Sequence, residues 1–242
     1  MDFGRSKKKV ASRALPVSAA GRLRLRWGRT EQMRLLSHLD NMRVIEKAIR
    51  DSRFPVAYSQ GAHPRMKLSF CPPLPTGFTS EAEYVDITLD QNCTGRLIDD
   101  IKNALPDGFL LLEAKTVFAK SASLSEAINR VVYVLKLKDD INIKELKQQI
   151  SEILERDRIE ITRKTKFGEA KVDIRPAIFQ LKIFDNHLSL TLGIGCSGYA
   201  RPTEVAQILL GLNDEQSAAL SFHRREMYRE TEDNRRIEGI EL

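Results

Sequence analysis

Apolar residues alternate with arginines near the start of the patterned part of the chain. Residues 22–27 read Arg-Leu-Arg-Leu-Arg-Trp, and a period of two residues predicts a strand with one buried and one solvated face. The three arginines, Arg22, Arg24 and Arg26, therefore share one face of this strand, which we expect to be in water.

A helical period follows the strand. Ser37 and Asp40 have the spacing of a capping box, with Asp in place of the usual Glu. The apolar residues after them recur every three or four positions, so the sequence predicts a helix over about 37–52. Residues 54–64 are predicted to form a loop, and residues 67–70 a short extended segment. The prolines of residues 71–77 prevent this segment from continuing as a hydrogen-bonded strand.

The remainder of the first half contains further segments with the two-residue period of a strand and with the period of a helix. Alternation predicts a strand over 83–89, a helical stripe covers 96–105, and a last strand fits 109–118. Strand, helix, strand, strand, helix, strand is the order of a ferredoxin-like, or split βαβ, unit, in which two helices cover one face of an antiparallel sheet. We therefore predict a first ferredoxin-like domain over residues 21–119.

A similar order of elements follows a polar, serine-rich stretch, residues 120–129, which we interpret as a linker. The predicted fold class is thus α+β, with a second ferredoxin-like domain in tandem over residues 130–230 and a frayed C-terminal tail over 231–242. The second domain's predicted strands are 131–137, 159–163 and a hairpin of 177–184 with 187–194, and its predicted helices are 143–154 and 202–210.

Composition places the chain among soluble globular proteins. Of its 242 residues, 42% are hydrophobic and 30% are charged, which excludes collagen-like and wholly disordered classes. The sequence contains no run of 18 apolar residues and no apolar segment after its N-terminus. We therefore expect no membrane span, no secretory signal and a cytoplasmic location.

The formal net charge of +6 is unevenly distributed. Residues 1–30 contain nine Lys or Arg and one Asp, so the excess of positive charge belongs to the N-terminal region. Residues 1–20 are expected to form a flexible basic tail. The alternative is an arm that docks on phosphates.

Metal and redox chemistry have little support in the sequence. Cys71, Cys93 and Cys196 are far apart and form no CxxC pair, and the four histidines are scattered. Glu81 and Glu83 share one face of a predicted strand, but this spacing is common on solvated or salt-bridged faces. We expect no metal site and no cofactor in this chain.

The loop after the first predicted helix has the richest chemistry. In it, Tyr58 can stack on a base, Gln60 can hydrogen-bond a base edge, and Arg65 and Lys67 can neutralise phosphate. This mixture suits a nucleotide or phosphorylated ligand. The alternative is a polar connection in which Tyr58 covers the core and His63 is solvated.

His38 is placed in the first turn of the predicted helix, where the helix dipole disfavours a charged imidazole. A neutral His38 could donate to a phosphate or act as a base, with His63 as its partner. Packing, or a bond to a backbone carbonyl, is the structural alternative.

Several ordered motifs between about Arg22 and Tyr228 resemble the uncharacterised radical-SAM-linked protein family. They are Ser37-His38-Leu39-Asp40, Tyr58-Ser59-Gln60-Gly61 with Pro64, Ser69-Phe70, Pro72-Pro73-Leu74-Pro75 with Gly77, Ser80 to Glu83 with Tyr84 and Asp86, Asp173-Ile174-Arg175-Pro176, and Arg201-Pro202-Thr203-Glu204. The resemblance implies a companion role to a B12-binding radical SAM protein. This chain has no CxxxCxxC triplet for an iron–sulfur cluster, so such a partner must be a separate polypeptide.

The leading hypothesis is a non-catalytic accessory protein that binds RNA or another phosphate-bearing substrate and works with that separate enzyme. The residues expected to converge into one binding surface are Arg22, Arg24, Arg26, His38, Tyr58, Gln60, His63, Arg65 and Lys67. One alternative is a metal-independent endoribonuclease with His38 and His63 as acid and base, by analogy with tandem ferredoxin-like CRISPR RNA-processing proteins. Another is a protein-docking module that binds no nucleic acid.

Overall fold

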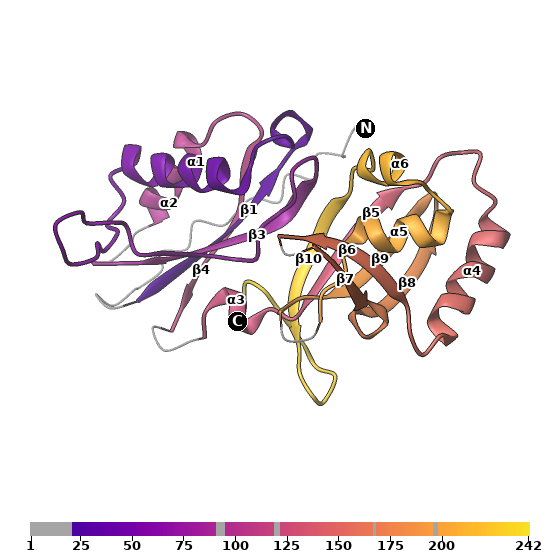
Figure 1. Ribbon diagram of the computed structural model, residues 1–242. Coiled ribbons are helices and arrows are strands. Elements are labelled where there is room, and N and C mark those ends of the chain that lie inside the picture. Colours follow the sequence, from indigo (N-terminus) through magenta and orange to yellow (C-terminus); the bar gives the residue numbers. More distant parts are fainter. Residues whose placement is uncertain (1–20, 91–94, 119–121, 167, 196–197) are drawn as a thin grey trace.

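The computed structural model describes residues 21–90, 95–118, 122–166, 168–195 and 198–242 (Figure 1). The predicted basic tail, Cys93 and Cys196 lie outside these ranges. The helices are α1 (His38–Asp51), α2 (Gly95–Ala104), α3 (Leu124–Ala127), α4 (Ile143–Glu155), α5 (Pro202–Leu210) and α6 (Asp214–Ala218), with 3₁₀ turns at Glu31–Met33 and Arg175–Ala177.

A large, mostly antiparallel sheet runs through the molecule in the strand order β4-β1-β3-β10-β5-β9-β8, with β2 paired to β3 and β11 to β10. Its strands are β1 (Arg22–Arg29), β2 (Leu68–Phe70), β3 (Thr79–Thr88), β4 (Phe109–Val117), β5 (Arg130–Lys136), β8 (Ile178–Phe184), β9 (His187–Gly193), β10 (His223–Glu230) and β11 (Arg236–Glu238). The predicted α+β class is confirmed at this level.

The two halves meet at one parallel pair of strands. Thr79 and Ser80 of β3 pair with His223 and Arg224 of β10, whereas the other strand pairs of this sheet are antiparallel. The last long strand of the chain therefore lies in the middle of the sheet and joins it into one structure.

Helix α1 forms where the sequence predicts a helix. Ser37 caps it, because its Oγ accepts a hydrogen bond from the backbone N–H of Asp40 at 3.2 Å and donates to the Asp40 carboxylate at 2.6 Å. The apolar stripe of α1, with Ile45 and Ile49, packs against Leu23 and Leu25 of β1. Helices α1 and α2 thus cover one face of the first-half strands (Figure 1).

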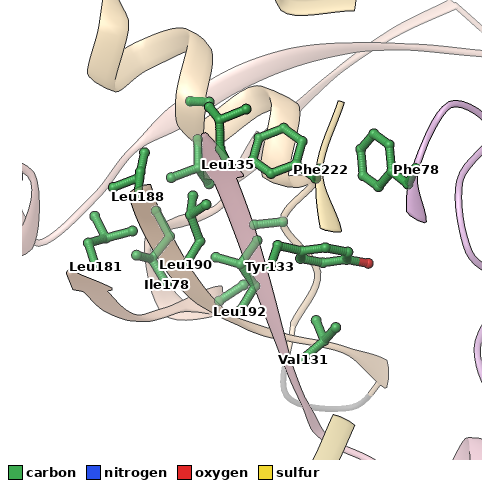
Figure 2. Close-up of a cluster of buried hydrophobic side chains, with 14 of the residues drawn as sticks. Phe78, Val131, Tyr133, Leu135, Ile178, Leu181, Leu188, Leu190, Leu192 and Phe222 are labelled. Atoms are coloured by element: carbon green, nitrogen blue, oxygen red, sulfur yellow. The ribbon is translucent and has the colours of Figure 1, made fainter. Parts of the chain in front are cut away.

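The core of the second half lies on the helix-covered face of β5, β8 and β9 and extends to Phe78 and Tyr84 of the first half (Figure 2). Leu188, Leu190 and Leu192 alternate along β9 and are fully buried. Helices α4 and α5 cover this face, and α5 ends at Gly211, whose positive φ of 61° suits a helix C-terminus. The hairpin predicted around Asp185-Asn186 is confirmed as β8 and β9.

Two segments of the second half differ from expectation. The predicted strand at 159–163 forms as β6 (Glu160–Thr165), but it pairs only with β7 (Gly168–Asp173) in a separate two-stranded sheet. The stretch interpreted as a linker contains α3, whose Leu124 is fully buried in the second-half core. Ala127 and Ile128 of the same stretch are also buried, so three apolar side chains anchor it to the core.

The arginine face of β1 is not solvated as predicted, because the C-terminal residues cover it. Arg24 is fully buried; its guanidinium binds both carboxylate oxygens of Asp86, at 2.6 and 2.8 Å, and donates to the carbonyls of Gly239 and Leu242. Instead of a frayed tail, residues 231–242 contain β11 and the buried Ile240. Gly239 packs so closely on β3 that a Cβ there would lie 2.6 Å from the Tyr84 ring.

Candidate functional site

The chemically rich loop is a hairpin, which we call the 57–67 hairpin. Tyr58 and Met66 form an antiparallel bridge. Inside it, the Ser59 N–H donates to the Arg65 carbonyl at 2.8 Å, and the Arg65 N–H donates to Ser59 Oγ at 3.0 Å. These contacts give the loop a defined shape beyond the C-terminal end of β3, at the end of the first half farthest from the second half (Figure 1).

The 57–67 hairpin presents five of the predicted site residues to solvent. Tyr58 is 45% exposed, and Gln60, His63, Arg65 and Lys67 are also exposed. The hairpin contains two cations and no Asp or Glu. An aromatic ring, an amide and two cations on one projecting element can together contact a base and its phosphates.

The arginine row is not part of this surface. Leu23 and Leu25 face α1, so Arg24 and Arg26 point to the opposite face of the sheet. The Arg26 Nε donates to the Glu81 carbonyl at 2.8 Å, and an Arg22 Nη lies 3.7 Å from the Asp86 carboxylate. The predicted convergence of all nine residues into one cationic surface is therefore wrong, since the internal partners of these arginines hold them on the other face.

His38 lies apart from the hairpin as well. It occupies the first turn of α1, with its ring edge-on to Phe70 at 6.3 Å between centroids. Burial lowers the pKa of His38, while the charge of Glu83 opposes and that of Arg224 adds to this shift. His63 lies in the hairpin that follows the other end of α1, a helix about 20 Å long. The two imidazoles therefore lie near opposite ends of α1 and do not form one site.

A buried polar cluster at the junction of the halves was missed by the sequence analysis. The Arg224 guanidinium binds the Glu83 carboxylate at 3.0 Å and donates to the Tyr133 hydroxyl at 3.0 Å. Ser80 Oγ donates to the same carboxylate at 2.7 Å. Both members of the ion pair are almost completely inaccessible to solvent. The Tyr133 ring belongs to the apolar core, and its hydroxyl points away from the leucines of β9 (Figure 2). We call Ser80, Glu83, Tyr133 and Arg224, with the neighbouring Arg29, the junction cluster.

The junction cluster also fixes the proline-rich segment. Arg224 donates to the carbonyls of Pro72 and Pro73, and Arg29 donates to those of Pro75, Phe78 and Leu36. Prolines offer carbonyl acceptors without N–H donors, so a buried guanidinium is a suitable partner for such a stretch.

The protonation states at the junction follow from burial. Arg29 is buried without a carboxylate bonded to it, and burial lowers its pKa, against the opposing charge of Glu83. Cys71 Sγ lies 3.6 Å from the Glu83 carboxylate, and burial and that charge both raise the pKa of the thiol. Cys71 is therefore a neutral packing residue rather than a nucleophile.

A comparison with known protein families matches most of the chain, including the 57–67 hairpin and part of the junction cluster. Residues 22–209 match the model of a family described as uncharacterized protein conserved in bacteria, DUF2344. The chain belongs to this family. A search of curated proteins found no match. The DUF2344 match includes the 57–67 hairpin and Glu83 but ends before β10, so Arg224 completes the junction cluster from beyond the matched residues.

Within the described ranges, no three His, Cys, Asp or Glu side chains are grouped so that they could hold a metal ion. None of the helices that the structure describes is long and apolar enough to cross a membrane.

Proposed function

We propose that this DUF2344 protein is a cytoplasmic, non-catalytic accessory protein that binds RNA through the 57–67 hairpin and works with a radical SAM enzyme on a separate chain. The observation that carries RNA binding is the exposure of Tyr58, Gln60, His63, Arg65 and Lys67 on one ordered hairpin without an acidic residue. The radical SAM partner is supported by the motif resemblance alone.

The hairpin's chemistry indicates how each side chain would act. Arg65 and Lys67 would pair with successive phosphates, Tyr58 would stack on an unpaired base, and Gln60 would bond a base edge. Phosphate pairing supplies affinity that falls steeply with salt, whereas stacking and amide contacts require an unpaired base.

We infer that the scaffold is a tandem of two ferredoxin-like units. The first-half strands have the order β4-β1-β3-β2 and the second-half strands the order β10-β5-β9-β8, all in antiparallel pairs. In each half the fourth strand lies beside the first, and the first lies beside the third, as a split βαβ unit requires. The β6–β7 pair is then an insertion in the second unit.

Fluorescence anisotropy of a labelled 12-nucleotide single-stranded RNA, titrated with the full chain at several salt concentrations, tests RNA binding. The double variant R65A/K67A should bind at least tenfold more weakly, and its log–log salt slope should fall by about 1.4, because two phosphate contacts are lost. The matched control is R50A/K102A, which removes one exposed Arg and one exposed Lys from α1 and α2. Absence of binding at low salt, or equal loss in both double variants, would contradict the proposal.

Affinity purification from native cytoplasm, with RNA and proteins both identified, tests the partner. A co-purified radical SAM protein that is retained after ribonuclease treatment would support the accessory role, and a complex without RNA would favour a docking module. The structure gives the endoribonuclease alternative no support, since His38 lies in the first turn of α1 and His63 lies in the hairpin that follows the other end of that helix.

A further inference from the structure

One face of the second-half sheet is covered by α4 and α5, and the other face has no helix on it in the part of the chain that the structure describes. On β5, β8 and β9, one set of alternating residues faces the helix-covered core of Figure 2. The other set must face the opposite side, and the strand register aligns it in rows across the sheet. One row joins Phe184, His187 and Lys136, and the next joins Lys182, Ser189 and Val134. We call this side the open face.

Aromatic rings lie on the open face beside cations. Phe184 is 38% exposed and stacks on the His187 imidazole at 5.6 Å with 14° between the planes. The Arg225 guanidinium, from β10, lies 5.8 Å from the Phe184 ring centroid. Farther along β8, Phe179 is 40% exposed, and the Arg130 guanidinium lies 3.4 Å from its centroid. The open face therefore carries exposed aromatic surface on which a further flat ring can stack.

The charge of the open face favours an anionic ligand. Lys136, Lys182 and Arg225 are exposed, and none has a carboxylate within ion-pair distance in the part of the chain described. The acids of the neighbouring strand β10 have their own partners: Glu230 pairs with Arg130, and Glu226 pairs with Arg236. Glu81, whose charge reaches Arg225, accepts a hydrogen bond from His223. Three cations therefore remain available near the Phe184–His187 stack.

We propose that the open face is a second RNA-binding site, at which an unpaired base extends the stack of Phe184 and His187 while Arg225, Lys136 and Lys182 contact the flanking phosphates. The site rests on the proposed RNA-binding function and adds to it the class of RNA, which is single-stranded, because a base within a duplex cannot reach a ring on a flat sheet. Gln180 and Ser189, exposed or half-exposed on the same face, supply the donors and acceptors that a 2′-hydroxyl requires.

The test replaces one ring and measures RNA affinity. F184L keeps an apolar side chain at the strand end but removes the stacking surface, so the dissociation constant for a labelled single-stranded 12-mer should rise about tenfold. The matched control is F118L, the same change at a ring that is 88% exposed in the first half; it should leave affinity unchanged. R225Q, with R50Q as control, should weaken binding and lower the salt slope by about 0.7.

Crosslinking locates the RNA independently of affinity. A 12-mer with one 5-iodouridine should crosslink to the peptide containing Phe184 and His187, and the F184L variant should lose this product. A 12-base-pair RNA duplex and the 2′-deoxy 12-mer should both compete more weakly than the single-stranded RNA.

The outcomes separate this site from the hairpin. If R65A/K67A weakens binding but F184L and R225Q do not, and crosslinks map only to the 57–67 hairpin, the second site is wrong and the proposed function stands. If no RNA binds at low salt, both fail. Equal competition by the deoxy oligomer would overturn the assignment to RNA.

Discussion

Arginines in two regions of this molecule have opposite surroundings. In the sheet interior, Arg24 and Arg224 are fully buried, each bound to a carboxylate from β3 and to backbone carbonyls. On the hairpin and the open face, Arg65 and Arg225 are exposed and have no carboxylate partner among the described ion pairs. The comparison shows that a row of arginines does not by itself indicate a nucleic-acid site. Arg24 and Arg224 are held inside by acids of β3, and Arg29 is held inside by backbone carbonyls alone.

The largest effect on stability is expected when the acid of the junction cluster, Glu83, is removed. Glu83→Ala leaves Arg224 buried beside Arg29 without a counter-charge, so the free energy of unfolding should fall by about 3 to 5 kcal/mol in urea denaturation. Glu113→Ala, an exposed carboxylate on β4, should cost less than about 0.5 kcal/mol. A loss below about 1 kcal/mol for Glu83→Ala would mean that the junction cluster does not hold the halves together.

A somewhat smaller effect is expected at Arg24. Arg24→Ala leaves the buried Asp86 with only the more distant Arg22 and frees the carbonyls of the C-terminal segment, at a cost of about 3 kcal/mol. Adding Asp86→Asn should restore part of this stability in a double-mutant cycle. Arg26→Ala, at a half-buried arginine with one carbonyl partner, is the control. Equal losses in Arg24→Ala and Arg26→Ala would contradict a special role for the buried pair.

The smallest effect concerns His38. Since burial lowers its pKa in the folded state, the unfolded chain binds the proton more readily. The contribution of neutral His38 to the free energy of unfolding is fully present above the unfolded-state pKa of about 6.5. It is lost as the pH falls from there toward the lower folded-state pKa. His38 remains partly exposed, so the change is below about 1 kcal/mol after solvent screening.

His38→Gln should therefore lose less stability than the natural chain between pH 7.5 and 5.5 in parallel urea titrations. NMR titration of the His38 ring gives the pKa directly. A pKa at or above 6.5, or equal pH dependence in the two chains, would refute this prediction.

Local patterns predicted most of the individual elements. The capped helix α1, the strands β1 and β9 and the β8–β9 hairpin depend on neighbours within a few residues, and their periods are clear. The exposure of Arg65 was predictable for the same reason, because a loop with Gly61 and Pro64 projects from the core, whereas the sequence left open whether Tyr58 is exposed or covers the core.

The junction could not be predicted in this way. Glu83 and Arg224 are 141 residues apart, and β10 has a register shift between Arg224 and Glu226 that breaks its period of two. Strand β10 is also rich in charged residues, and ion pairs within the protein satisfy Arg224, Glu226 and Glu230. A polar strand of this kind resembles a surface tail until its partners are known.

The parallel pairing of β3 with β10 has a consequence for how the chain is made. During synthesis the first half is complete more than a hundred residues before His223 leaves the ribosome. Until then the backbone at Thr79 and Ser80 is unpaired on the side that β10 later occupies, and Glu83 has no cation from β10. A polypeptide interrupted before His223 would present this open edge, and we expect quality-control proteases to remove it rather than to leave a half-length product in the cell.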